Sequence, residues 1–499
     1  MQQKIQKLKN ILAEASDLKY VIALLEWDQQ TYMPKGGAEA RAQQLGTLGK
    51  LAHEMSTSPE LGKLLDELRN RVESMDPDSD NARMVRFAIR DYERETCVTP
   101  EFVVERARVT SMANHTWEEA RAKADFSIFQ PHLEKIVDLT HRYIDFFPPA
   151  DHPYDVLLDI YEPGMKTSDV KNIFDELRPK QVNLVKAIGQ KDQVENSFLY
   201  QPFDEKKQWE FGIEVITGMG YKMEWGRQDK SHHPFTTEFS INDVRITTRV
   251  DPKFFNTMIF SSIHEAGHAL YAQGHSKDLE RTNLADGASL AVHESQSRMW
   301  ENLVGRSLPF WEYYYPRLQD YFPQLNSVDL DTFYKGINRV EPSLVRVEAD
   351  EATYNLHIML RLELEIGIIE GKIKVEDLPQ IWNAKMKEYL GVEPDNDAQG
   401  VLQDVHWSVG AFGYFSTYAL GNLISVQLWD KINQDIPGLT GEIGAGKFDT
   451  LLEWLRTNIH THGRKFMPRE LVKRVVGSKI DPAPYLRYLE EKFGKIYGL

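Results

Sequence analysis

The chain has one cysteine, Cys97, in 499 residues, so it can form no internal disulfide and is typical of proteins from a reducing compartment. It lacks an apolar run of the ~18 residues that a membrane-spanning helix needs, and its first residues predict an amphipathic helix rather than a secretion signal. Positive charge is also in deficit, because 59 Lys and Arg face 75 Asp and Glu, a net charge of −16. This balance argues against nucleic-acid and anionic-membrane partners, and we expect a cytoplasmic protein.

Helical periodicity dominates what the chain does contain, and it predicts a mostly α fold. A proline-containing stretch at 147–153 predicts a connection within a single domain over 1–499, between a helical lobe at about 1–147 and a catalytic part at about 154–499. The predicted helices cover 5–32, 41–53, 59–74, 80–96, 100–124, 129–147, 167–191, 205–218, 289–304, 310–322, 330–340, 344–371, 375–390, 410–432, 448–461 and 468–476.

One convincing β signal interrupts the helices. Residues 235–240 and 244–250 flank a turn at Asn242-Asp243 and predict a small antiparallel hairpin. Alternation places Val244, Ile246, Thr248 and Val250 on one face of the second strand. The hairpin could pair with an extended peptide along its edge, or it could only brace the helix that follows; both alternatives are open.

A predicted helix over 252–273 contains His264-Glu265-Ala266-Gly267-His268. Asp251 is a good N-cap, Pro252 suits the first helical position, and Gly274 lies just past the predicted end. The two histidines, at i and i+4, point to the same side. Their face also carries Thr257, Ser261 and Tyr271, and the opposite, apolar face carries Phe255, Met258, Ile259, Ala266, Ala269 and Leu270.

This pattern predicts a zinc site. Two neutral imidazole nitrogens one turn apart can bind one Zn²⁺ at about 2.0–2.1 Å. Glu265, one step round the helix, can reach the water of the metal without binding the metal itself, as in the H-E-x-x-H arrangement of zinc peptidases. The alternative is that both histidines only cap or pack.

Glu294 is the predicted third ligand. It lies 26 positions after His268 on the helix predicted over 289–304, and three protein ligands leave a fourth position open for water, as catalytic zinc requires. The alternative for Glu294 is an ordinary i,i+4 ion pair with Arg298.

Six segments in this order along the chain carry a family resemblance: Trp27-Asp28-Gln29, Asp243-Val244-Arg245-Ile246-Thr247, the histidine pentad, His293-Glu294-Ser295-Gln296, Val345-Arg346-Val347-Glu348-Ala349-Asp350-Glu351 and Gly400-Val401-Leu402-Gln403-Asp404-Val405-His406-Trp407. With them, nearly the whole chain resembles the carboxypeptidase Taq family of zinc metallocarboxypeptidases. Val345, where the family often has Ile, is a small departure that should not affect the chemistry.

The resemblance implies a fold like that of neurolysin and angiotensin-converting enzyme, with two helical lobes around a deep groove that has zinc at its floor. It implies removal of single C-terminal residues from peptides with broad specificity and poor handling of C-terminal proline. It also implies a homodimer with one zinc ion per chain, which cobalt or manganese can replace.

The resemblance further implies roles for individual residues. His406 and Tyr418 correspond to a His…Tyr pair that stabilises the oxyanion, with Tyr414 in reserve, and Glu265 serves as general base. Arg346 is the candidate for the substrate carboxylate, since a guanidinium matches a carboxylate in shape. Its alternative is an ion pair with Asp350, which lies one turn later on the predicted helix. His233 and Arg245, beside the hairpin, are weaker candidates for substrate contacts.

Two other functions compete with the carboxypeptidase. An endo-oligopeptidase on the same fold would also cut peptides whose C-terminus is blocked. A metal-free binding protein would bind no zinc, although His264, Glu265, His268 and Glu294 argue against it. His460 and His462 lie in a predicted loop and are interpreted as exposed surface rather than metal ligands.

Overall fold

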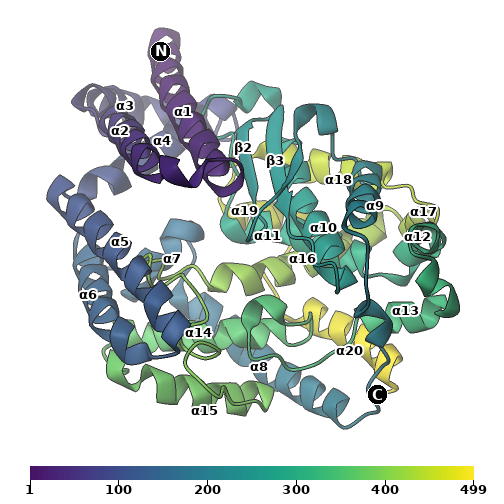
Figure 1. Cartoon of the computed structure of the whole chain (residues 1–499). Helices are drawn as coiled ribbons and strands as arrows, with labels where there is room; N and C mark the ends of the chain where they lie inside the picture. Colours follow the sequence, from purple (N-terminus) through teal and green to yellow (C-terminus); the bar gives the residue numbers. More distant parts are fainter.

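The computed structural model describes all 499 residues and contains twenty α-helices and one small sheet (Figure 1). The helices of the first half are α1 Gln2–Thr31, α2 Ala38–Ser56, α3 Pro59–Val72, α4 Asp80–Cys97, α5 Pro100–Lys123, α6 Phe126–Asp145, α7 Tyr154–Tyr161, α8 Thr167–Gly189, α9 Glu205–Gly218 and α10 Phe255–Ala272. Those of the second half are α11 Leu290–Arg298, α12 Leu308–Tyr321, α13 Leu330–Ile337, α14 Tyr354–Ile369, α15 Leu378–Leu390, α16 Ser416–Asp435, α17 Leu439–Gly444, α18 Asp449–Asn458, α19 Pro468–Val476 and α20 Ala483–Tyr497.

The predicted fold class is confirmed, and α9 and α19 have the predicted bounds. Helices α7, α17 and α20 were not predicted. The first two are only 8 and 6 residues long, too short to show a clear helical period.

The predicted antiparallel hairpin is confirmed as β2 Thr236–Ser240 and β3 Asp243–Thr248. A third strand, β1 Gln228–Lys230, was missed; it pairs in parallel with β3 and is only three residues long. The sheet order β1-β3-β2 leaves β2 at an edge. Val244, Ile246 and Thr248 are buried, and both β2 and β3 pack against α10, so the sheet does brace that helix.

Several predicted helices begin later than expected, and in α10, α14 and α16 the structure shows a local cause. Helix α10 begins at Phe255 instead of 252, because the carboxylate of Asp251 accepts a hydrogen bond from the Lys253 amide (2.8 Å) and so caps a separate turn. Helix α14 begins at Tyr354 instead of 344, and the side chain of Asp350 accepts from the Ala352 amide (2.9 Å) just before it. Helix α16 begins at Ser416 instead of 410, after two glycines with positive φ, Gly410 and Gly413.

Two hydrophobic cores hold the chain together. The larger contains 99 buried residues and joins α5 and α6 to the helices that follow them. The smaller contains 16 buried residues, contributed by α1, α3 and α4 together with Leu279, Leu284 and Ala285 from the connection between α10 and α11. A lobe boundary near residue 147 stays a prediction.

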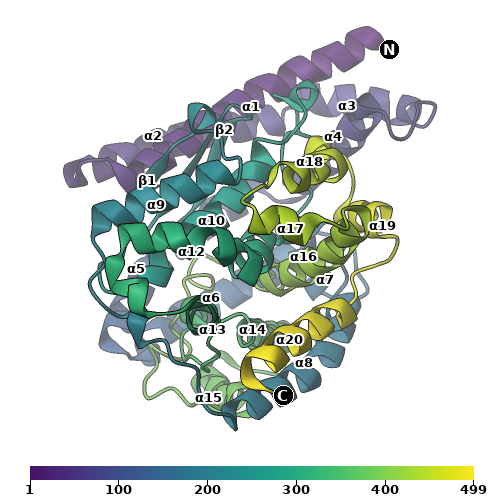
Figure 2. The same cartoon turned by 90° about the vertical axis from the view of Figure 1, so that its right-hand side faces the viewer.

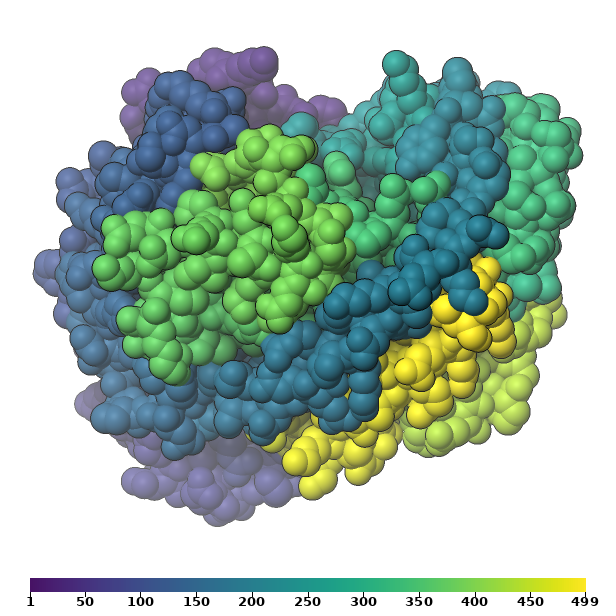
Figure 3. All heavy atoms as spheres, turned by 90° about the horizontal axis from the view of Figure 1, so that it is seen from below, coloured from purple at the N-terminus to yellow at the C-terminus, as the bar shows by residue number.

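The centre of the molecule is formed by α10, α11 and α16, with the sheet above α10 and the N-terminal helices beyond it (Figure 1). Seen from the side, α1 runs along one end of the molecule and packs on β2 (Figure 2). From below, α8 lies between α15 and the C-terminal α20, which closes the chain (Figure 3). No helix combines the length and apolar character needed to cross a membrane.

Candidate metal centre

Helix α10 carries His264, Glu265 and His268, and the buried side chains on its apolar face hold it in place. The predicted apolar face is confirmed, since Phe255, Met258, Ile259, Ala266, Ala269 and Leu270 are all buried. Tyr271 was wrongly grouped with the polar face: it is fully buried, and its hydroxyl accepts a hydrogen bond from the Ala288 amide (3.1 Å).

The structure brings His264, His268 and Glu294 together, with one ligand atom from each within 4.8 Å of the others. Glu294 Oε2 lies 3.7 Å from His264 Nε2 and 3.5 Å from His268 Nε2. Ligands about 2.0–2.1 Å from a tetrahedral ion are separated by roughly 3.4 Å, so these spacings fit one such ion. The donor set of two imidazoles and one carboxylate suits zinc in type as well.

The two carboxylate oxygens of Glu294 have different partners. Oε2 faces the two imidazoles, whereas Oε1 accepts a hydrogen bond from Arg298 Nε (2.7 Å). Glu294 therefore faces the two histidines as a metal ligand would, and at the same time forms the i,i+4 ion pair with Arg298. Burial disfavours the charged carboxylate, but Arg298 and His264 outweigh it and lower the pKa of Glu294. The carboxylate is thus held ionised for a cation.

Glu301 supports His264 from behind. It faces His264 Nδ1 at 2.9 Å and accepts from Arg298 Nη1 (3.3 Å) and Arg306 Nη2 (3.3 Å). An imidazole that donates from Nδ1 to a carboxylate leaves the lone pair of Nε2 free for a metal. Glu301 belongs to a π-helical stretch, Met299–Gly305, where the helix predicted over 289–304 departs from α geometry.

A cluster of aromatic and imidazole rings lies behind His268. The Nδ1 atoms of His268 and His293 are 2.6 Å apart, and burial together with His268 holds the pKa of His293 well below its usual value, so His293 is neutral and can accept. The ring of Tyr271 lies 5.2 Å from that of His460. His460 is fully buried and pairs with Gln296 (2.9 Å), so its interpretation as exposed surface is wrong.

Glu265 is held by the edge strand. Its carboxylate accepts a hydrogen bond from the hydroxyl of Thr236 in β2 (2.6 Å), and only 6% of the residue is exposed. The strand therefore fixes the orientation of the one acidic side chain of the pentad.

His406, Tyr414 and Tyr418 form a second group beside these residues. His406 Nε2 lies 3.3 Å from the Tyr418 hydroxyl, and the ring centroids of Tyr414 and Tyr418 are 5.3 Å apart. Burial lowers the pKa of His406 to about 4 against the opposing effect of Asp404, and burial raises the pKa of Tyr418 well above its usual value. Both side chains are therefore neutral hydrogen-bond donors near neutral pH.

Arg346 lies in a short 3₁₀ turn instead of a helix, and its predicted alternative partner was wrong. It donates from Nε (3.0 Å) and Nη2 (2.8 Å) to Asp404, rather than to Asp350, and from Nη1 to the Tyr354 hydroxyl (2.9 Å). Its guanidinium also lies 4.9 Å from the ring centre of Tyr418. Arg346 therefore adjoins the His406–Tyr418 group.

The two weaker candidates lie at the sheet. His233 is exposed in the loop before β2, against the ring of His232. Arg245 in β3 pairs through two hydrogen bonds of 2.9 Å with Asp243 and stacks on Trp27 of α1. Arg245 thus has structural partners of its own.

Several contacts around the centre were not predicted from the sequence. Thr236 and Glu301 act on the pentad from other elements, and their spacing along the chain follows no recurring pattern. His293 was noted only as part of a family segment, without a role. Glu365 did leave a signal, since it is the single acidic residue in the otherwise apolar stretch 364–369 and must find partners when that helix is buried.

Comparisons with known proteins agree with this geometry. A family model described as carboxypeptidase Taq (M32) metallopeptidase matches residues 7–493. Thermostable carboxypeptidase 1 of Thermus thermophilus is 42% identical over 503 residues, which cover 99% of both chains. Carboxypeptidase 1 of Bacillus subtilis is 39% identical over 492 residues, 98% of both chains. The crystal structure of an M32 carboxypeptidase from Deinococcus radiodurans gives a TM-score of 0.97 at 40% identity, with both chains fully covered.

These matches extend from end to end of the chain, and they confirm the resemblance that the motifs predicted. In this chain the fold places the histidine pentad on a central helix with a small sheet packed on it. The chain therefore belongs to the carboxypeptidase Taq (M32) family of metallopeptidases and is a metallocarboxypeptidase, a peptide hydrolase.

Proposed function

We propose that the protein is a zinc-dependent carboxypeptidase that releases single residues from the C-terminal ends of peptides, and that His264, His268 and Glu294 hold the metal. The observation that carries this proposal is the convergence of these three side chains with Glu265 beside them. Three protein ligands instead of four are the donor set of catalytic zinc.

Glu265 is the general base of the proposed reaction. A zinc ion bound by the three ligands supplies Lewis-acid activation of water and of the scissile carbonyl. The Glu265 carboxylate accepts the proton of the attacking water and later gives it to the leaving amine. The hydrogen bond from Thr236 supports this role, because it holds the carboxylate in one orientation.

His406 and Tyr418 stabilise the negative charge that develops on the carbonyl oxygen. Donors aimed at that oxygen lower the barrier most when they are already in place. The neutral state of both groups supports this assignment, since each keeps a proton to donate. Tyr414 is the reserve candidate.

Arg346 binds the C-terminal carboxylate of the substrate. Asp404 and Tyr354 occupy three of its five N–H groups, and the remaining two can serve a ligand. His233 and Arg245 are proposed as further substrate contacts.

The remaining expectations also become proposals. The enzyme has broad specificity with poor handling of C-terminal proline, uses one zinc ion that cobalt or manganese can replace, and works in the cytoplasm as a homodimer. Light scattering on the purified protein tests the dimer, and release rates from peptides that differ only in the last residue test the specificity.

The proposed reaction is tested with an unblocked peptide and its C-terminally amidated twin, each with and without a chelator. Mass spectrometry should show stepwise single-residue losses from the free C-terminus, none from the amidated peptide, and none once the metal is removed. Internal cleavage of the amidated peptide would instead identify an endo-oligopeptidase. A purified protein without bound metal and without hydrolysis would favour a binding protein.

A further inference from the structure

The segment that carries His406 and Tyr414 has no regular structure of its own. It runs from Gln403 to Phe415, between α15 and α16, and turns through positive φ at Gly410 (72°) and Gly413 (92°). A stretch without a helix or strand ladder keeps its shape only if outside partners bond its polar groups. The position of both side chains therefore depends on what holds this segment.

Glu365 of α14 is the main outside partner. It is fully buried, and its carboxylate accepts hydrogen bonds from Trp407 Nε1 (2.8 Å), the Gly413 amide (2.9 Å) and the Tyr154 hydroxyl (2.5 Å). Trp407 directly follows His406, and Gly413 directly precedes Tyr414. One buried carboxylate thus ties together the neighbours of both side chains.

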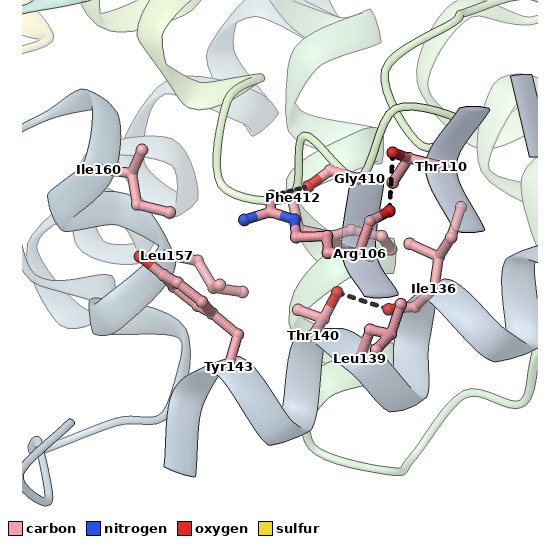
Figure 4. Close-up of a pocket in the computed structure, with 10 residues that line it drawn as sticks. All are labelled: Arg106, Thr110, Ile136, Leu139, Thr140, Tyr143, Leu157, Ile160, Gly410 and Phe412. Atoms are coloured by element: carbon pink, nitrogen blue, oxygen red, sulfur yellow. Dashed lines mark hydrogen bonds between the residues drawn. The ribbon is translucent and has the colours of Figure 1, made fainter. Parts of the chain in front are cut away.

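The same face of α14 anchors the start of the segment. Arg361, one turn before Glu365, donates to the side chains of Asp404 (2.6 Å) and Gln403 (2.7 Å). Arg106 of α5 donates to the Gly410 carbonyl (3.1 Å), as Figure 4 shows. Both residues line a small cavity of about 10 Å³. Bonds from two helices therefore fix the segment along most of its length.

Close packing leaves the segment little freedom between these bonds. A Cβ atom on Gly413 would lie 2.7 Å from the carbonyl carbon and oxygen of Leu157 in α7. The backbone of the segment is thus pressed between α7, which also supplies Tyr154, and α14. Disruption of the bonds from Glu365 to Trp407 and Gly413 therefore has to move the segment itself.

We propose that Glu365 is a positioning residue, which through Trp407 and Gly413 fixes His406 and Tyr414 relative to each other. The inference rests on the proposed function, in which His406 and the neighbouring tyrosines act on the substrate carbonyl. Three donors converge on the two oxygens, and only a carboxylate accepts from all of them. An amide at this position leaves an N–H group facing another donor.

Glu365→Gln tests this role, with Tyr154→Phe as the matched control. We expect Glu365→Gln to lower kcat on a short unblocked peptide by between about tenfold and 100-fold, as small displacements of catalytic groups do. KM and bound metal should stay within about twofold, since Arg346 and the metal ligands have other supports. Tyr154→Phe removes one donor without creating a conflict, so its kcat should stay within about twofold.

A kcat of Glu365→Gln equal to that of the unmodified enzyme would overturn the proposal, as would a loss of rate in the folded variant that is fully explained by lost metal. If Glu365→Gln does not fold, Trp407→Phe carries the test, because it removes the N–H that donates to Glu365, together with part of the indole ring, and should also lower kcat at constant KM. An unchanged kcat in that variant overturns the proposal equally. Failure of the unmodified enzyme to release C-terminal residues would instead count against the proposed function.

Discussion

Within the metal centre, single atoms of one side chain have separate partners. One oxygen of Glu294 faces the imidazoles and the other is bonded to Arg298, while Nδ1 of His264 faces Glu301. Glu265 has a third arrangement, with its carboxylate bonded to Thr236 of another element. Substitutions at these positions should therefore separate metal binding from turnover.

Glu265→Gln should keep its metal and lose turnover. The amide fills the same volume but accepts no proton, so we expect kcat to fall about 100-fold or more. Metal analysis and kcat on the same preparation check this outcome. A Glu265→Gln enzyme with normal kcat would refute Glu265 as the base.

Thr236→Val should lower kcat about tenfold without loss of metal, because the Glu265 carboxylate loses the donor that orients it. Thr236→Ser is the matched control, since it keeps the hydroxyl and should retain most of the activity. Equal rates in the Val and Ser variants would show that the hydrogen bond has no part in turnover.

Among the single residues of the site, those that follow a helical spacing could be predicted from the sequence. His264, Glu265 and His268 come from one turn of one helix, and Arg298 was already weighed as the partner of Glu294. Thr236, Glu301 and Glu365 were not identified, because their contacts with the site join elements that are distant along the chain. Arg346 was named only through the resemblance, and its partner Asp404 lies 58 positions away.

Among the elements, close approach of three helices forms the centre. A Cβ atom on Gly267 of α10 would lie 2.7 Å from the Ser297 Cα in α11. A Cβ atom on Gly421 of α16 would lie 2.6 Å from the Glu294 Cγ. Neither glycine has a positive φ, so packing rather than backbone conformation requires them.

Gly267→Ala should therefore destabilise the protein, by about 1–3 kcal/mol, because the overpacked backbone of α11 has to move. The same shift should weaken metal binding. Gly46→Ala in α2 is the matched control: its Cβ would have no neighbour within 4 Å, and alanine should stabilise that helix by roughly 0.5–1 kcal/mol. Thermal unfolding of both variants measures the difference, and equal shifts of their midpoint temperatures would contradict the packing argument.

Arg298→Lys should reduce metal affinity by about 10–100-fold, as is usual when the partner of a ligand is changed. Lysine keeps the charge but cannot bond Glu294 and Glu301 at once from a planar group. Competition with a fluorescent chelator measures the affinity directly, without reference to turnover. An unchanged affinity would show that charge alone is enough.

The start of each element was harder to predict than its existence. Gly410 and Gly413 are compatible with a helical pattern on paper, yet their positive φ makes the segment before α16 irregular. Asp251 is a plausible N-cap, but its carboxylate accepts a hydrogen bond from the Lys253 amide and forms a separate turn before the helix. In both cases a local hydrogen bond or dihedral competed with the periodic pattern and prevailed.

For the whole molecule, buried titratable groups determine how stability depends on pH. His275 is 5% exposed, and neither ring nitrogen has a hydrogen-bond partner in the protein. Burial lowers its pKa to about 4. An unfolded histidine has a pKa of about 6.5, so between these two values the unfolded chain binds more protons than the folded one.

Stability should therefore fall as the pH is lowered from about 6.5 to about 4, and His275 alone should contribute up to roughly 3 kcal/mol of that loss. His275→Leu removes this contribution, so its stability should depend less on pH over the same range. Denaturant unfolding of both proteins at several pH values measures the difference. Parallel curves would show that another group is responsible.

The smaller hydrophobic core has a consequence for any attempt to dissect the chain. Its members from α1, α3 and α4 cover Leu279, Leu284 and Ala285, which lie in the connection between the helices that bear His268 and Glu294. A fragment that starts after α4 would present these apolar side chains to water, next to the backbone that sets the ligand spacing. The N-terminal helices thus support the part of the chain that carries the metal ligands. A fragment without them should be less soluble and should bind the metal more weakly.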